Sequence, residues 1–175
     1  MKNVALLIFL LPTLVYAQQK VTPIVKNQGA IYEIEEAVEF PDSTLQYKIV
    51  IDMKSGASKE GDVAFALYNT ARMMNLHGTG GIEGKNMEVI GVVHSEATKS
   101  ILSDSAYKAH YGMNNPNTDL IAALAEAGVK IYVCGQSLIA RGFKVEELNS
   151  NVQVSVSALT ILTTYQLKGY ALLIF

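Results

Sequence analysis

The sequence predicts an α/β fold built on a mostly parallel sheet of about five strands. Short apolar runs, typical of strands buried on both faces, recur along the chain. Longer segments with helical spacing lie between them, and glycine, asparagine or serine marks most of the boundaries. Alternation of this kind implies right-handed crossovers and helices on both faces of the sheet.

The strands are predicted from runs of apolar or alternating residues. The second run, MEVIGVV, is followed directly by His94 and Ser95. A short fourth strand is indicated by the alternation of Val152, Val154 and Val156. The predicted strands are residues 45–52, 87–93, 129–133, 152–156 and 170–175.

The helices are predicted from apolar spacing and from end signals. Val63, Leu67, Ala71 and Met74 would share one face of the first helix. The Asn115–Pro116 pair predicts a later helix start, with asparagine as N-cap and proline at the first helical position. The predicted helices are residues 62–76, one or two short ones within 96–112, and then 115–127, 137–141 and 158–168.

The chain is expected to have three parts. Residues 1–17 resemble a signal peptide, because Lys2 precedes a short apolar run and Ala17 ends a typical cleavage site. Residues 18–44 are expected to form an extended arm, and residues 45–175 a single α/β domain. We therefore expect an exported protein, periplasmic or secreted, without stable membrane insertion.

The charge of the chain argues against nucleic-acid binding. Lys and Arg number 14 against 16 Asp and Glu, a formal net charge of −2, and no clustered basic face is evident. One cysteine and three scattered histidines do not give the ligand spacing of a zinc site. We expect no metal and no cofactor.

The single cysteine, Cys134, is the most informative residue. It lies in KIYVCGQSLIARG, at the end of an apolar strand and just before a predicted helix start. Backbone N–H groups at such a position favour the thiolate. A lone cysteine in an exported protein is otherwise a buried hydrophobe or an intermolecular partner.

Other candidate site residues follow the same edge of the predicted sheet, where strand ends converge. His94 is a candidate ion-pair partner or general base for Cys134, or a histidine satisfied by local backbone. Gln136 is expected to orient a ligand or cap the helix. Ser95, Ser137 and Arg141 complete the predicted ligand-binding set, although an exposed Arg141 on a short helix is the more common case.

Several segments, taken together, resemble one known family. They are VVHSEAT at 92–98, AYKAHYG at 106–112, NPNTDLIAALAEAGVKIYVCGQSLIARG at 115–142, and VSALTILTTYQLKGYALLIF at 156–175. Their order and spacing resemble the DsrE/DsrF-like sulfur-relay superfamily, and most closely the exported DsrE-family proteins of bacteria. The resemblance implies a flavodoxin-like three-layer sandwich, assembly into trimers or hexamers, and persulfide transfer by a cysteine at the position of Cys134.

Three functions are compatible with these residues. The first is a sulfur carrier, in which Cys134 accepts sulfane sulfur from one thiol-bearing partner and passes it to another. The second is a non-catalytic oligomeric module that binds a small ligand, with Cys134 lining a pocket. The third is a hydrolase or transferase that uses Ser137 with His94, although the last glycine of a nucleophile elbow is missing.

Overall fold

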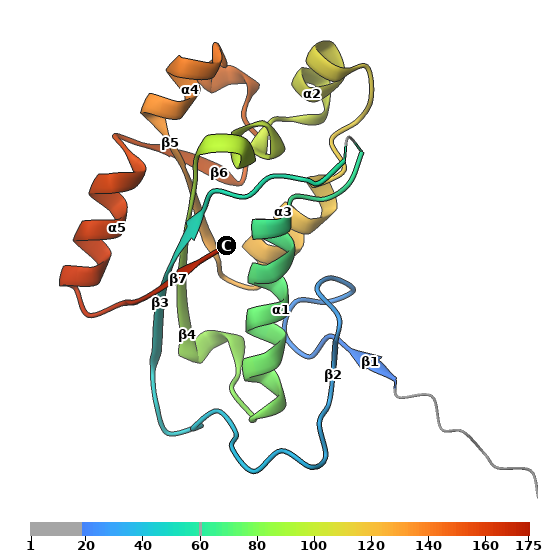
Figure 1. Cartoon of the computed structure of the whole chain (residues 1–175), viewed down its shortest axis with the longest axis vertical. Helices are drawn as coiled ribbons and strands as arrows, with labels where there is room; N and C mark the ends of the chain where they lie inside the picture. Colours follow the sequence, from blue (N-terminus) through green and yellow to red (C-terminus); the bar gives the residue numbers. More distant parts are fainter. Residues whose placement is uncertain (1–18, 60) are drawn as a thin grey trace, which may run out of the picture.

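The computed structural model describes residues 19–59 and 61–175, so the predicted signal peptide lies outside the described residues. Its centre is a five-stranded sheet flanked by helices (Figure 1). Within the described ranges, no helix has the length and apolar character needed to cross a membrane.

All neighbouring strands of the main sheet are parallel, and their order across the sheet is β6-β5-β4-β3-β7. The predicted α/β class and the parallel five-stranded sheet are therefore confirmed. The strands are β3 (Tyr47–Met53), β4 (Met87–Val93), β5 (Lys130–Cys134), β6 (Val152–Ser155) and β7 (Ala171–Ile174).

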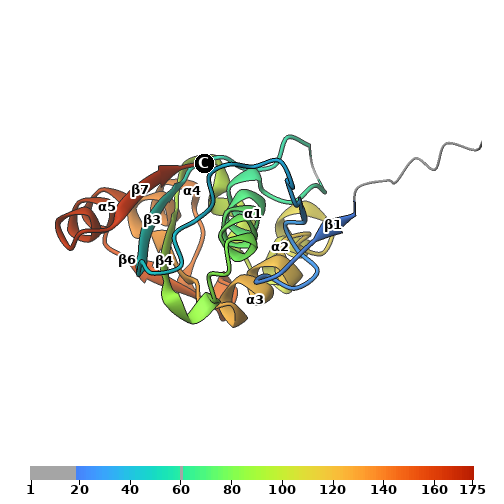
Figure 2. The same ribbon diagram turned by 90° about the horizontal axis from the view of Figure 1, so that it is seen from below.

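The helices form a layer on each face of this sheet. Figure 2 shows α1 and α3 on one side and α5 on the other. The α-helices are α1 (Phe65–Thr79), α2 (Asp104–Tyr111), α3 (Thr118–Glu126), α4 (Gly135–Arg141) and α5 (Ala158–Leu167). Three short 3₁₀ segments complete the domain: η1 (Gly84–Asn86), η2 (Ser95–Ile101) and η3 (Val145–Glu147).

The two helical layers are unequal. The large core lies between the sheet and α1 with α3, and includes Ile51, Leu67 and Leu124, all fully buried. The α5 side has a small cluster around Val92, Cys134 and Ala158. Most of the stabilisation by apolar burial therefore comes from the α1 side.

Two predicted helix boundaries were wrong. The first helix was expected over residues 62–76 but spans Phe65–Thr79. Its start is fixed by a distant residue, because the Ala64 N–H donates to Asn117 Oδ1 at 2.7 Å. Gly78 lies inside the helix and against Pro23, where a Cβ atom would be 2.8 Å from the ring.

The helix predicted to begin at Asn115 starts at Thr118, with Asn117 as its N-cap residue. Asn115 is buried and bridges two segments, because its amide donates to the carbonyls of Ser100 (2.8 Å) and Leu102 (2.7 Å). Its own Oδ1 accepts from the N–H of Asn117 at 2.9 Å. Tertiary hydrogen bonding, rather than local capping, decides the role of Asn115.

The arm packs along α1 and contains the antiparallel pair β1 (Lys20–Val21) and β2 (Ile31–Tyr32). Asn75, fully buried in α1, holds it by four hydrogen bonds. Its Oδ1 accepts from the N–H groups of Ile24 (3.0 Å) and Val25 (2.8 Å). Its Nδ2 donates to the carbonyls of Gln28 (2.8 Å) and Gly29 (3.0 Å). One side chain therefore satisfies four backbone groups of the arm.

Replacing Asn75 is expected to release the arm. Asn75→Ala leaves buried donors and acceptors without partners, so we expect a loss of about 3 kcal/mol in unfolding free energy. Urea denaturation measures this loss, and limited proteolysis should show earlier cleavage within residues 19–44. Asn69→Ala on the same helix is the control, because Asn69 binds only an exposed arginine on its own helix. Equal stability of the two variants would contradict the assigned role of Asn75.

Candidate functional site

The candidate site lies where β3, β4 and β5 end. The strands are neighbours, and Val93 pairs with Val133 while Cys134 pairs with Ser155 of β6. The residues that follow Met53, Val93 and Val133 therefore meet at the carboxyl edge of the sheet. This is the edge at which open α/β sheets place their binding sites.

Cys134 is the last residue of β5 and the N-cap of α4. Its side chain turns to the α5 face of the sheet, where it packs with Val92 and Ala158. The residue is 6% exposed, so it is mostly covered by its neighbours.

Hydrogen-bond donors at two separate helix starts act on the thiol of Cys134 and lower its pKa. The first turn of α4 contributes the N–H groups of Gln136 and Ser137 and the hydroxyl of Ser137. The first turn of α5 contributes the N–H of Ala158, from more than twenty residues further along the chain. Four donors around one sulfur are suited to a negative charge.

These donors decide the ionisation of the thiol. Burial is the largest single influence and raises the pKa of Cys134, because it disfavours the charged form. The hydrogen bonds from Ser137, Ala158 and Gln136 together outweigh it, so the pKa of the thiol lies below its ordinary value. A thiol that is both covered and acidified differs from an inert buried cysteine.

Gly135 allows the two helix starts to converge. A Cβ atom at this position would lie 2.8 Å from the carbonyl oxygen of Ser155, which is rigid backbone. Glycine therefore lets the end of β6 pass close to the start of α4. The chain then reaches Ala158 within three residues, with Ser157 as the N-cap of α5. This close contact explains why a glycine follows Cys134 in the sequence.

His94 is bonded to groups other than the thiol. Its Nε2 contacts Asp52 Oδ1, and its Nδ1 lies 2.9 Å from Ser95 Oγ. Asp52 stands at the end of β3, the strand next to β4. His94 is not among the groups that act on the pKa of Cys134. The hydroxyl next to the sulfur belongs to Ser137, and the hydroxyl next to the imidazole belongs to Ser95.

The Asp52–His94–Ser95 chain fixes the imidazole. With Nε2 donating to the carboxylate, Nδ1 accepts from the Ser95 hydroxyl, which defines the tautomer. Ser95 has φ +52°, a left-handed conformation that is uncommon for a residue with a Cβ atom. Any proton transfer by His94 would thus involve Ser95 and Asp52, rather than Ser137.

The remaining predicted residues lie around the same edge. Arg141 Nη2 donates to Glu96 Oε1 at 2.9 Å, so this guanidinium joins α4 to η2. The side chain of Gln136 is exposed, and its backbone N–H is the part directed at the sulfur. Among the described residues, no group of three or more His, Cys, Asp or Glu side chains is arranged to hold a metal ion.

Two participants were given no role by the sequence reasoning, although Asp52 was expected at this edge. Asp52 had a usable signal, because it ends the strand predicted over residues 45–52, at the edge where His94 was also expected. Ala158 had none, because a backbone N–H carries no side-chain signature and its approach depends on the packing of α5. The structure therefore adds a carboxylate and a main-chain donor to the predicted set.

The model of the DsrE/DsrF-like family matches residues 46–175, which is most of the chain. The chain belongs to the DsrE/DsrF-like family. The matched region begins just before β3, so the arm lies outside the family match. No curated protein matches the sequence.

Two solved structures have the fold of this DsrE/DsrF-like chain. One is MTH1491 from Methanobacterium thermoautotrophicum, a protein of unknown function, with a TM-score of 0.56 and 19% identity over 74% of this chain and 99% of that one. The other is the YchN protein from E. coli, with a TM-score of 0.53 and 20% identity over the same shares of the two chains. At this identity the likeness shows the fold alone.

Proposed function

We propose that the protein is a sulfur carrier in which Cys134 holds sulfane sulfur as a persulfide. The observation that carries the proposal is the place of Cys134 at the end of β5 and the start of α4, where donors of α4 and α5 lower the pKa of its thiol. Membership of the DsrE/DsrF-like family supports it, because the resemblance at VCGQS implies a sulfur-bearing cysteine at this position.

The chemistry needs no cofactor. The Cys134 thiolate attacks the outer sulfur of a persulfide or polysulfide donor, and the donor's S–S bond breaks. An organic persulfide leaves as its thiolate, and inorganic polysulfide leaves as hydrosulfide or as a polysulfide shorter by one sulfur. An acceptor thiolate then attacks the outer sulfur of the Cys134 persulfide, and Cys134 leaves as a thiolate. The same donors stabilise Cys134 as nucleophile in the first step and as leaving group in the second.

The burial of Cys134 limits which molecules can deliver sulfur to it. A cysteine that is only 6% exposed is reached more readily by a small linear molecule than by a thiol on another folded protein. We therefore propose inorganic polysulfide or a small organic persulfide as the donor. A lone cysteine also has no internal disulfide partner, which keeps the thiol free in the exported setting that the sequence predicts.

The sulfur-carrier proposal predicts a mass gain of one sulfur atom. Reduced protein incubated with polysulfide should carry the adduct by intact-mass analysis, and dithiothreitol should remove it with release of sulfide. Cys134→Ser should carry none, and Ser105→Ala, which removes an exposed hydroxyl on α2, should behave as the unmodified protein. An unmodified wild-type protein would contradict the proposal and favour the alternative, a binding module without catalysis.

We also propose that a second copy of the chain covers the α5 side of the sheet. In α5 only Ala158 is buried, whereas Leu159 is 76% and Leu167 is 90% exposed. Val156, just before α5, is 74% exposed, and Ile139, on α4, is 78% exposed. Apolar residues so exposed beside a binding site indicate a contact surface, and most soluble oligomers are assembled from copies of one chain.

Sedimentation velocity tests this assembly. We expect a mass of several chains for the wild-type protein, and a shift towards monomer for Leu159→Glu, because a buried unpaired charge weakens an interface strongly. Val38→Glu is the matched control, since Val38 is 98% exposed on the arm. A monomeric wild-type protein, or equal behaviour of the two variants, would overturn the proposed surface.

A further inference from the structure

Three side chains at the carboxyl edge of the sheet form a hydrogen-bonded chain that ends on an exposed hydroxyl. Asp52 Oδ1 accepts from Nε2 of His94, and Nδ1 of the same ring accepts from Ser95 Oγ at 2.9 Å. The carboxylate and the imidazole are 17% and 21% exposed, whereas Ser95 is open to solvent. Carboxylate, imidazole and hydroxyl in this order are the arrangement that activates a serine as a nucleophile.

The backbone at Ser95 has the left-handed conformation of a nucleophile turn. Ser95 has φ +52° and connects the end of β4 to η2. In α/β hydrolases the nucleophilic serine occupies a strained strand-to-helix turn, which exposes its hydroxyl at the edge of the sheet. The N–H of the next residue, here Glu96, supplies an oxyanion donor in such turns. Val93 and Ala97 stand where that motif has glycines, so the likeness lies in the backbone and not in the sequence pattern.

The loop that follows β3 holds this strained turn in place. The N–H of Ala97 donates to the Lys54 carbonyl at 3.2 Å. Two residues further along the loop, Gly56 packs on the turn, because a Cβ atom there would lie 2.8 Å from the carbonyl oxygen of Glu96. An unfavourable backbone conformation that the surrounding structure fixes in this way is typical of functional sites.

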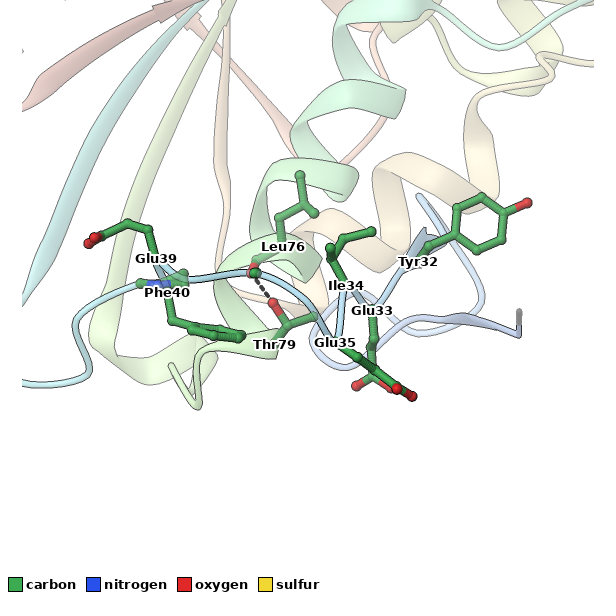
Figure 3. A pocket seen from close by; sticks show the side chains of 10 residues that line it. Tyr32, Glu33, Ile34, Glu35, Glu39, Phe40, Leu76 and Thr79 are labelled. Carbon is green, nitrogen blue, oxygen red and sulfur yellow. Dashed lines mark hydrogen bonds between the residues drawn. The ribbon is translucent and has the colours of Figure 1, made fainter. Parts of the chain in front are cut away.

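The hollow of about 430 Å³ between the arm and α1 lies away from Ser95 (Figure 3). Leu76 and Thr79 line it near the end of α1. Tyr47, at the start of β3, contacts His77 of the same part of α1 with ring centroids 4.7 Å apart, which places the hollow at the amino edge of the sheet. Ser95 instead follows the carboxyl end of β4 on an exposed turn. Such a turn suits a short acyl group, because a long hydrocarbon chain needs an apolar lining.

We propose that Ser95 is the nucleophile of a second activity, the hydrolysis of small acyl esters. Ser95 Oγ attacks the ester carbonyl while His94 Nδ1 takes the hydroxyl proton, and Asp52 stabilises the imidazolium that forms. The bond to the leaving group breaks, and the imidazolium gives its proton to the departing oxygen. Water, deprotonated by the same nitrogen, then attacks the acyl-serine, which releases the carboxylic acid and restores the hydroxyl. No step uses Cys134, so the activity is independent of the proposed carrier function.

Reaction with p-nitrophenyl acetate tests the proposal, with nitrophenolate release followed by absorbance and the acetylated residue located by peptide mass mapping. Every protein in the comparison carries Cys134→Ser, because an activated thiol also reacts with this ester. We expect nitrophenolate release above the rate in buffer and an acetyl group on Ser95. Ser95→Gly should abolish both while keeping the fold, because glycine adopts the left-handed turn without strain.

Two further variants separate catalysis from a structural role. Asp52→Asn should lower kcat about a hundredfold and leave KM unchanged, because the carboxylate acts on the imidazolium of the transition state and not on the bound ester. Ser105→Ala, which removes an exposed hydroxyl on α2, should leave both constants unchanged. The proposal would be overturned by no acetylation of Ser95, by full activity in Ser95→Gly, by an unchanged kcat in Asp52→Asn, or by an equal loss in Ser105→Ala.

Discussion

The hydrogen bonding around the Cys134 sulfur is the interaction on which the functional reading depends. A cysteine at the end of a buried strand would normally be an apolar filler with a raised pKa. Here the first turns of α4 and α5 both direct donors at it, and their combined effect exceeds that of burial. Gly135 makes this arrangement sterically possible, because a Cβ atom at this position would lie 2.8 Å from the Ser155 carbonyl oxygen of β6.

The remainder of the fold positions these two helix starts. The parallel pairing of β4, β5 and β6 sets Cys134 beside Ser155, and the Ser155 hydroxyl donates to the Val133 carbonyl at 3.0 Å, which secures the end of β6. On the opposite face, the core beneath α1 and α3 supplies most of the buried apolar surface. On the α5 side only Ala158 of the helix is buried, so α5 contributes little to the core. Such a face fits the proposal that another chain covers it.

The parallel sheet and the position of Cys134 at a strand end could be predicted from the sequence, because apolar runs and glycine stops are local signals. The start of α3 was misplaced, since Asn115 and Asn117 have similar capping potential and only the fold shows that Asn115 bridges Ser100 and Leu102. The partners of His94 depend on strand neighbours and on the left-handed backbone of Ser95. The Ala158 donor depends on long-range packing, which no local pattern encodes.

The most direct test is a pH titration of the Cys134 thiolate by its ultraviolet absorbance, with Cys134→Ser as the blank. The four donors predict a midpoint below that of a free cysteine thiol, and a higher midpoint in Ser137→Ala, which lacks one donor. Ser95→Ala should titrate as the wild-type protein, because Ser95 binds His94 rather than the sulfur. A wild-type midpoint at or above that of free cysteine would contradict the central claim that this thiol is activated.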